Sequence, residues 1–135
     1  MTDPLFLSLE EVLELHADQL RRFGGTAGLR DKGALESAIA VPSATFGGEF
    51  LHTGLFEMAA AYAFHIAQNQ PFLDGNKRAG LNACLVFLML NGWEVVDPQG
   101  ALYEAMLAFA VGSLDKLGFA ALLESLATEI DTTVL

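Results

Sequence analysis

The sequence contains one cysteine and no apolar run long enough to cross a membrane. A single cysteine cannot form a disulfide within the chain, and Cys84 lies in an apolar stretch, which predicts a buried core residue rather than a nucleophile. The longest strongly apolar run, residues 83–90, is far shorter than the roughly 18 residues that suggest a membrane span, and residues 1–5 lack the basic start of a signal peptide. We therefore expect a cytoplasmic protein without a membrane partner.

Basic residues are also scarce, with 7 lysines and arginines against 17 aspartates and glutamates and a formal net charge of −10. A chain of this charge has no general attraction to nucleic acid, so we expect no nucleic-acid partner. Any phosphate group must therefore be bound by a local cluster. The sequence also lacks a Walker loop, a dinucleotide-binding fingerprint and cysteines and histidines at zinc-ligand spacing.

Apolar residues are plentiful and make up 53% of the 135 residues, enough for a buried core in one domain over residues 1–135. Ser8 and Glu11 form a capping-box pattern before a first helix that ends at Gly24-Gly25. Apolar residues at helical spacing, with glycines and prolines at the ends, predict further helices over residues 31–41, 53–69, 76–91 and 97–111. A last helix, or a pair of helices with a kink at Gly118, is predicted over residues 114–129. The helix over 76–91 is apolar nearly all round, so we expect it to be central and buried, and we expect an Asp97-Pro98 start for the next one.

Residues 43–52 contain two short β-prone pieces on either side of Gly47-Gly48, which is the pattern of a β-hairpin. The pieces are too short for a larger sheet, so we expect a flap, and residues 93–96 form one further short extended piece. Together these patterns predict an all-α fold with one small β-hairpin.

The loop between the two most apolar helices, Asn-Gln-Pro-Phe-Leu-Asp-Gly-Asn-Lys-Arg over residues 69–78, has the features of a phosphate site. Lys77 and Arg78 fall in the first turn of a helix, where the helix dipole disfavours cations unless an anion lies in front of them. Free backbone N–H groups at the helix start bind such an anion, and Gly75 lets it approach the backbone closely.

The other polar residues of this loop suit a bound polyphosphate. One carboxylate together with phosphate oxygens is a usual Mg²⁺ environment, which Asp74 can supply, and the Asn76 amide can donate to a phosphate oxygen. Phe72 is expected to anchor the loop in the core. The plainer alternative is a solvated turn in which Asp74 is the N-cap and forms a surface salt bridge.

Residues 70–78 closely resemble the Fic/Doc signature, which in its Doc branch reads close to His-Pro-Phe-x-Asp-Ala/Gly-Asn-Lys-Arg. The matching positions are Pro71, Phe72, Asp74, Gly75, Asn76, Lys77 and Arg78. With residues 28–31, 35–38 and 46–48, the resemblance spans roughly residues 9 to 110. It implies a compact Fic-type helical bundle, and Fic enzymes transfer a nucleotide moiety, usually AMP, from ATP to a protein hydroxyl.

Two positions resemble the Doc branch rather than the Fic enzymes: Lys77 stands where those have glycine, and Leu81 where they have a second arginine. In Doc toxins these changes go with transfer of the γ-phosphoryl group of ATP to elongation factor Tu. The resemblance therefore implies a protein-modifying phosphotransferase that uses ATP and Mg²⁺. It also implies an antitoxin partner whose disordered tail folds over the site.

By the same resemblance, Asp74 holds Mg²⁺, and the phosphates are bound by Gly75, Asn76, Lys77 and Arg78. The catalytic set is then Gln70, Asp74, Lys77 and Arg78. A target segment is expected to add as a strand to the flap. The residues of this flap are Thr45, Phe46, Gly47, Gly48, Glu49 and Phe50.

Gln70 departs from the family pattern, because the motif begins with a histidine that takes the proton from the target hydroxyl. An amide cannot accept that proton, although it can orient a hydroxyl by hydrogen bonding, and losing a general base typically costs about 10² to 10⁴ in rate. Three functions stay open: a slow Doc-like kinase, a nucleotidyl (AMP) transferase of Fic type, and a catalytically impaired phosphate- or nucleotide-binding module.

None of the three histidines of the chain is assigned to the site, and one ion pair is interpreted as structural. We expect His65 to be a half-buried, hydrogen-bonded residue on its helix rather than a substitute base, His16 on the first helix to be structural, and His52 to be exposed at the end of the flap. Arg30 and Asp31 are expected to pair at the start of the second helix.

Overall fold

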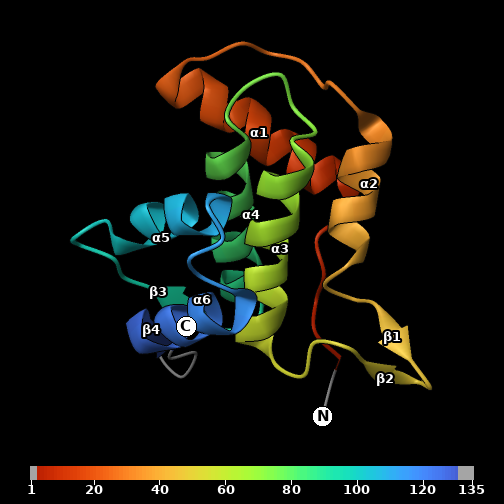
Figure 1. Ribbon diagram of the computed structural model, residues 1–135, viewed down its shortest axis with the longest axis vertical. Helices are drawn as coiled ribbons and strands as arrows, with labels where there is room; N and C mark the ends of the chain where they lie inside the picture. Colours follow the sequence, from red (N-terminus) through yellow and green to blue (C-terminus); the bar gives the residue numbers. More distant parts are fainter. Residues whose placement is uncertain (1–2, 131–135) are drawn as a thin grey trace.

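The computed structural model describes residues 3–130, and the part of the chain that it describes is mostly helical (Figure 1). In chain order the elements are α1 (Leu9–Phe23), α2 (Lys32–Ala40), β1 (Thr45–Phe46), β2 (Glu49–Phe50), α3 (Leu55–Asn69), α4 (Asn76–Leu90), β3 (Trp93–Val95), α5 (Ala101–Ala110), α6 (Lys116–Leu126) and β4 (Ala127–Glu129). The expected all-α class with a β1–β2 hairpin is confirmed, and a second two-stranded sheet, β3–β4, is added to it.

Local signals set the ends of the first two helices as predicted. The Glu11 N–H donates to the Ser8 hydroxyl at 3.2 Å, and the Glu11 carboxylate accepts from the Ser8 N–H at 2.9 Å, which completes the capping box. Gly24, with φ +80°, ends α1, and the Asp31 carboxylate caps α2 by accepting the Ala34 N–H.

Helices α3 and α4 lie side by side at the centre of the bundle, and the other helices pack around them (Figure 1). Their backbones approach closely, because a Cβ placed on Gly80 of α4 would lie 2.6 Å from the carbonyl oxygen of Ala63 in α3. Cys84 is fully buried here, as predicted, and burial raises the pKa of its thiol. The pair therefore forms the core of the domain, and the loop that connects them sits on a rigid base.

The face of α4 near its C-terminus is open, which corrects the expectation that this helix is buried all round. Met89 is 55% and Leu90 41% exposed. The opposite side of the helix, which includes Gly80, Cys84 and Phe87, is buried.

The C-terminal part of the described chain differs from the predicted helix or helix pair over 114–129, because the last residues of that range form a strand. Helix α6 ends at Leu126, and β4 pairs antiparallel with β3, so that Trp93 lies opposite Glu129 and Val95 opposite Ala127. The reason is that the backbone of β3 needs a hydrogen-bonding partner. Strand β4 provides this partner. The Ile130 N–H extends the pairing by one hydrogen bond, which it donates to the Gly92 carbonyl at 2.8 Å.

The predicted Asp97-Pro98 start of α5 is also wrong. The helix begins at Ala101 with Gly100 at its N-cap. Asp97 still caps it, from one turn earlier, because its carboxylate accepts the N–H groups of Ala101 and Leu102, both at 2.9 Å. The proline lies in the turn, where it needs no backbone donor.

No helix within residues 3–130 combines the length and the apolar character that crossing a membrane requires.

The contact between Gly80 and Ala63 predicts a strong effect of Gly80→Ala. The new methyl group would press on backbone atoms of α3, so we expect the free energy of unfolding to fall by about 1–3 kcal/mol in denaturant titrations. Gly33→Ala in α2 is the matched control, because its Cβ would meet nothing closer than 3.4 Å. There, helix propensity predicts a gain of up to about 1 kcal/mol. Equal stabilities for the two variants would refute the close-packing account.

Candidate functional site

The loop between α3 and α4 bends sharply at both ends. Gln70 caps α3 with φ +48° and ψ +56°, and it is the only residue other than glycine with a positive φ within residues 3–130. Gly75, at φ +76°, is the N-cap of α4. Pro71 and Phe72 are buried between these bends, which confirms the expected anchoring by Phe72. The free N–H groups at the start of α4 therefore face away from the core.

Two buried polar residues of α1 hold the loop from one side. The ring of His16, only 4% exposed, stacks on Phe72 with centroids 3.7 Å apart and planes 8° apart. Its Nε2 lies 2.9 Å from the Asp74 carbonyl oxygen and donates to it, because a carbonyl can only accept. The Gln19 amide donates to the Gly75 carbonyl at 3.2 Å and accepts from Asn82 at 3.3 Å.

We call His16 and Gln19 the α1 anchor. His16 has the structural role that was expected, with the Asp74 carbonyl as its partner. Gln19 was not singled out in the sequence. One signal was present. Both residues are polar and sit one helical turn apart on the side of α1 that is otherwise apolar. Polar side chains on a buried face need partners, and here the partners are the loop carbonyls.

Asn76 closes the loop from within. Its side-chain carbonyl accepts the Phe72 N–H at 2.9 Å, and its amide donates to the Phe72 carbonyl at 3.0 Å. The side chain thus holds the loop in shape, and the part of Asn76 that faces an anion at the helix start is its backbone N–H. A side-chain contact from Asn76 to phosphate stays a prediction.

Residues 25–31, which connect α1 to α2, run along the opposite side of the loop, and we call this segment the strap. Leu29 of the strap forms an antiparallel β-bridge with Phe72. The Leu73 N–H donates to the Gly28 carbonyl at 3.0 Å. Figure 1 shows the strap passing over the same end of the bundle as the α3–α4 loop.

Arg30 fixes the entry to the loop. Its guanidinium donates to the carbonyls of Asn69 and Gln70 at 3.0 and 2.7 Å, and its backbone N–H donates to the Pro71 carbonyl at 2.7 Å. A cation on the last carbonyls of a helix is also favoured by the dipole. The expected pairing of Arg30 with Asp31 is therefore wrong, since each side chain caps a different helix.

The N-terminal end of α4 opens on a cavity of about 420 Å³. The signature residues that line it are Asp74, Gly75, Asn76, Lys77 and Arg78. Phe23 of α1 and Tyr103 of α5 form other walls. The structure thus gathers the predicted metal ligand and all four predicted phosphate-binding residues around one space.

Arg78 is held over two aromatic rings that the sequence did not point to. Its guanidinium carbon lies 4.8 Å from the centroid of Phe23 and 5.4 Å from that of Tyr103. These contacts orient the cation without neutralising it. No local pattern marks Phe23 or Tyr103 in the sequence, because they lie on helices far from the loop along the chain.

The plainer alternative for the loop, a capped turn with a salt bridge, does not describe this geometry. The N-cap of α4 is Gly75, and no side chain caps it. Within residues 3–130 the salt bridges involve only Arg21 and Arg22, so neither Lys77 nor Arg78 is paired with a carboxylate. Two cations at the positive end of a helix dipole leave the cavity suited to an anion.

Asp74 is exposed at the edge of this cavity, and its carboxylate fits a Mg²⁺ ion that is shared with phosphates. One oxygen, Oδ2, accepts the Thr26 N–H at 3.0 Å, and Oδ1 makes no hydrogen bond within the described residues. No three histidine, cysteine or acidic residues in residues 3–130 gather as a metal cluster. A metal ion here would therefore take most of its remaining ligands from phosphate and water.

Gln70 lies outside the cavity and lines a separate hollow of about 150 Å³ with Phe64, Met106 and Phe109. Lys77 lines both this hollow and the cavity at the start of α4. None of the three histidines lines the hollow of Gln70.

His65 and His52 instead meet Lys116 of α6. The Lys116 Nζ lies 3.0 Å from Nε2 of His65 and 3.4 Å from Nε2 of His52. Burial, and next the charge of Lys116, lower the pKa of His65 to about 4 and also lower the pKa of His52. His52 is half-buried, so the expectation that it is exposed was wrong. Both imidazoles are neutral and engaged at pH 7, and neither replaces the missing histidine.

The flap is formed as predicted but does not lie beside the loop. Thr45 pairs with Phe50 and Phe46 with Glu49, and Phe46 is 82% exposed. The hairpin precedes the N-terminus of α3, whereas the loop follows its C-terminus, and 15 residues of helix span about 22 Å. Figure 1 shows the two at opposite ends of the bundle. Target docking at the flap stays a prediction.

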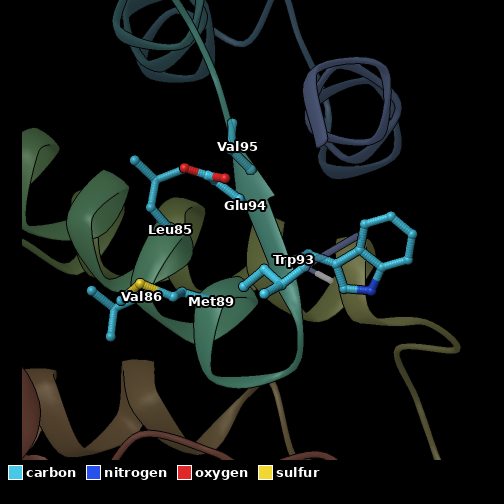
Figure 2. A pocket seen from close by; sticks show the side chains of 7 residues that line it. Leu85, Val86, Met89, Trp93, Glu94 and Val95 are labelled. Carbon is cyan, nitrogen blue, oxygen red and sulfur yellow. The ribbon is translucent and has the colours of Figure 1, made fainter. Parts of the chain in front are cut away.

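A larger apolar groove of about 470 Å³ lies on the open face of α4. Figure 2 shows Leu85, Val86 and Met89 of α4 next to β3, whose Glu94 is the one charged residue of the lining. None of the predicted site residues lines this groove.

Comparisons with known proteins agree with the motif. A model of the Fic/DOC family matches residues 6–88, a range that includes α1, the strap and the signature loop. The chain is 40% identical to "Protein kinase doc" of Escherichia phage P1 over 91 residues, which cover 67% of this chain and 71% of that protein. It is 41% identical to "Toxin Doc" of Mycolicibacterium smegmatis over 70 residues, or 52% of this chain and 54% of that protein.

The α1 anchor predicts that His16→Phe destabilises the loop although it keeps an aromatic ring against Phe72. The Asp74 carbonyl loses its donor, and an unsatisfied, partly buried acceptor costs about 1–3 kcal/mol. We expect a loss of that size in the free energy of unfolding and faster amide hydrogen exchange over residues 74–78. Wild-type stability and exchange in this variant would mean that ring stacking alone holds the loop.

Proposed function

The chain belongs to the Fic/DOC family, and from that premise we propose that it is a Doc-like toxin that transfers a phosphoryl group from ATP to a hydroxyl of a target protein, with Mg²⁺ as cofactor. The observation that carries the proposal is the convergence of Asp74, Lys77 and Arg78 on one cavity at the N-terminus of α4. No other space described within residues 3–130 combines unpaired cations, free helix N–H groups and a carboxylate.

The chemistry of phosphoryl transfer suits such a site. The transition state is loose, so the protein has to position the phosphates and offset their charge rather than form covalent bonds. The first N–H groups of α4 bind phosphate oxygens, and Lys77 and Arg78 add fixed positive charge. Asp74 would hold Mg²⁺, which when bound offsets further phosphate charge.

In this proposal Gln70 limits the rate of phosphoryl transfer. Its amide can orient the target hydroxyl, and the shared lining residue Lys77 supports a position of that hydroxyl near the transferred group. Without a histidine at this position the hydroxyl proton has no strong acceptor, so transfer is slow. A loose transition state tolerates this loss better than one that needs a fully formed nucleophile.

The proposed partners follow from the family. The target is a translation factor such as elongation factor Tu in the cytoplasm, and an antitoxin with a disordered tail holds the toxin inactive. The relatives named "Toxin Doc" and "Protein kinase doc" support the toxin and kinase assignments, respectively.

Two other functions compete with this one. Gln70 favours a phosphate-binding module without catalysis, since the cavity is intact while the base is missing. Nucleotidyl transfer is disfavoured because Leu81, which stands in place of the second arginine of Fic enzymes, is buried in the core and offers no charge.

Radiolabel transfer separates the three functions. Wild type, Gln70→His and Asp74→Ala are incubated with Mg²⁺, a bacterial lysate and ATP labelled at either the γ or the α phosphate. We expect weak protein labelling from the γ phosphate in wild type, labelling stronger by about 10² or more in Gln70→His, and none in Asp74→Ala.

Other labelling results would identify one of the two competing functions or contradict the proposal. Labelling from the α phosphate would establish nucleotidyl transfer. Labelling in Gln70→His alone would establish a disarmed binding module, and no labelling in any variant, despite binding of ATP, would contradict the proposed phosphotransferase.

A further inference from the structure

The strap touches the functional carboxylate directly. The Thr26 N–H donates to Oδ2 of Asp74 at 3.0 Å across 48 residues of sequence. At the preceding position, a Cβ on Gly25 would lie 2.9 Å from the same Oδ2. The backbone of the strap therefore approaches Asp74 so closely that no side chain fits between them.

The strap itself is fixed, so this contact is not that of a freely moving loop. Its far end is bound to the signature loop by Arg30, whose backbone N–H donates to the Pro71 carbonyl and whose side chain donates to the Gln70 carbonyl, both at 2.7 Å. Its near end begins after Gly24, where α1 ends. Helix α1 in turn holds the Asp74 carbonyl through His16.

Asp74 needs such a support. Its side chain is exposed, and within the described residues it has no partner other than the Thr26 N–H. An exposed aspartate turns freely about its side-chain bonds, whereas a carboxylate held at one oxygen presents the other in a set direction.

We infer that the strap is a positioning element for Asp74: the Thr26 backbone N–H holds Oδ2 and leaves Oδ1 for a metal ion. This inference rests on the proposed use of Mg²⁺ at Asp74. Groups that hydrogen-bond a metal-ligating carboxylate typically change metal affinity by about 10- to 100-fold when they are lost. Gly25 is then required for two reasons, its φ of +120° and the absence of a side chain that would press on Oδ2.

Two substitutions at one position isolate the N–H group. Thr26→Pro removes it, and Thr26→Ala keeps it while removing the side chain, which makes no hydrogen bond within residues 3–130. ATP binding is measured by calorimetry over a series of Mg²⁺ concentrations. We expect the half-saturating Mg²⁺ concentration to rise about 10- to 100-fold in Thr26→Pro and to stay within about twofold of wild type in Thr26→Ala. ATP affinity in EDTA should be the same in all three proteins, which a general distortion of the site would not allow.

Gly25→Ala provides an independent variant if Thr26→Pro does not fold. It should also raise the Mg²⁺ requirement, because its methyl group displaces Oδ2. Gly112→Ala is the matched control for backbone strain, since Gly112 has φ +76° and open space around its Cβ position. Both variants should lose stability, but only Gly25→Ala should change the Mg²⁺ requirement.

Amide hydrogen exchange without any ligand tests the contact on its own. The Thr26 amide should exchange at least about tenfold faster in Asp74→Ala than in wild type, since exchange requires an open hydrogen bond. Equal rates would overturn the inference whatever the protein binds.

The binding outcomes separate this inference from the proposed function. If wild type shows no Mg²⁺-dependent ATP binding, the proposed function fails, and the Mg²⁺ role inferred for the strap fails with it, even where the exchange result confirms the Thr26 contact. If wild type binds and Thr26→Pro matches Thr26→Ala, the inference fails while the function stands.

Discussion

The hydrogen-bonding needs of the short loop between α3 and α4 shape the rest of this structure. The loop bends too tightly to satisfy its own carbonyls, so donors come from three directions. His16 and Gln19 donate from α1, Arg30 donates from the strap, and Asn76 donates from inside the loop. With the carbonyls turned toward these donors, the N–H groups at the start of α4 stay free. These free N–H groups, together with Lys77 and Arg78, leave the start of α4 suited to an anion.

The residues that hold the loop in place are therefore different from Gln70, the residue at the position of the motif histidine. The residues that hold the loop act on its backbone atoms, on the Phe72 ring or on Asp74, and none acts on the Gln70 side chain. Gln70, which stands in place of the motif histidine, lines a hollow separate from the cavity at the start of α4, and Lys77 is the one residue that lines both. A chain of this kind can keep nucleotide binding while its transfer rate changes by orders of magnitude, which is why binding and transfer have to be measured separately.

The features that were predicted correctly from the sequence depend on contacts between residues close together in the chain. The Ser8–Glu11 capping box, the end of α1 at Gly24 and the hairpin at Gly47-Gly48 each involve partners only a few residues apart. The contacts that were missed join distant segments: His16 reaches Asp74 across 58 residues, and Arg30 reaches Gln70 across 40. Strand β4 was predicted to be helical because its pairing with β3 also joins segments that are distant in the sequence. Lys77 and Arg78 were recognised because two cations at the start of a helix are electrostatically unfavourable unless an anion binds there. Phe23 and Tyr103 have no such unusual feature in the sequence.

We propose that residues 74–78 form an anion site that exists before any ligand binds. The most direct test is to titrate Mg²⁺ and ATP into ¹⁵N-labelled protein and to follow every backbone amide by NMR. The chemical shifts should change only at residues 74–78 and at their neighbours in α1, the strap and α5, while those of the core of α3 and α4 stay unchanged. Shifts centred on the apolar groove of Leu85, Val86 and Met89, or spread through the core, would contradict it.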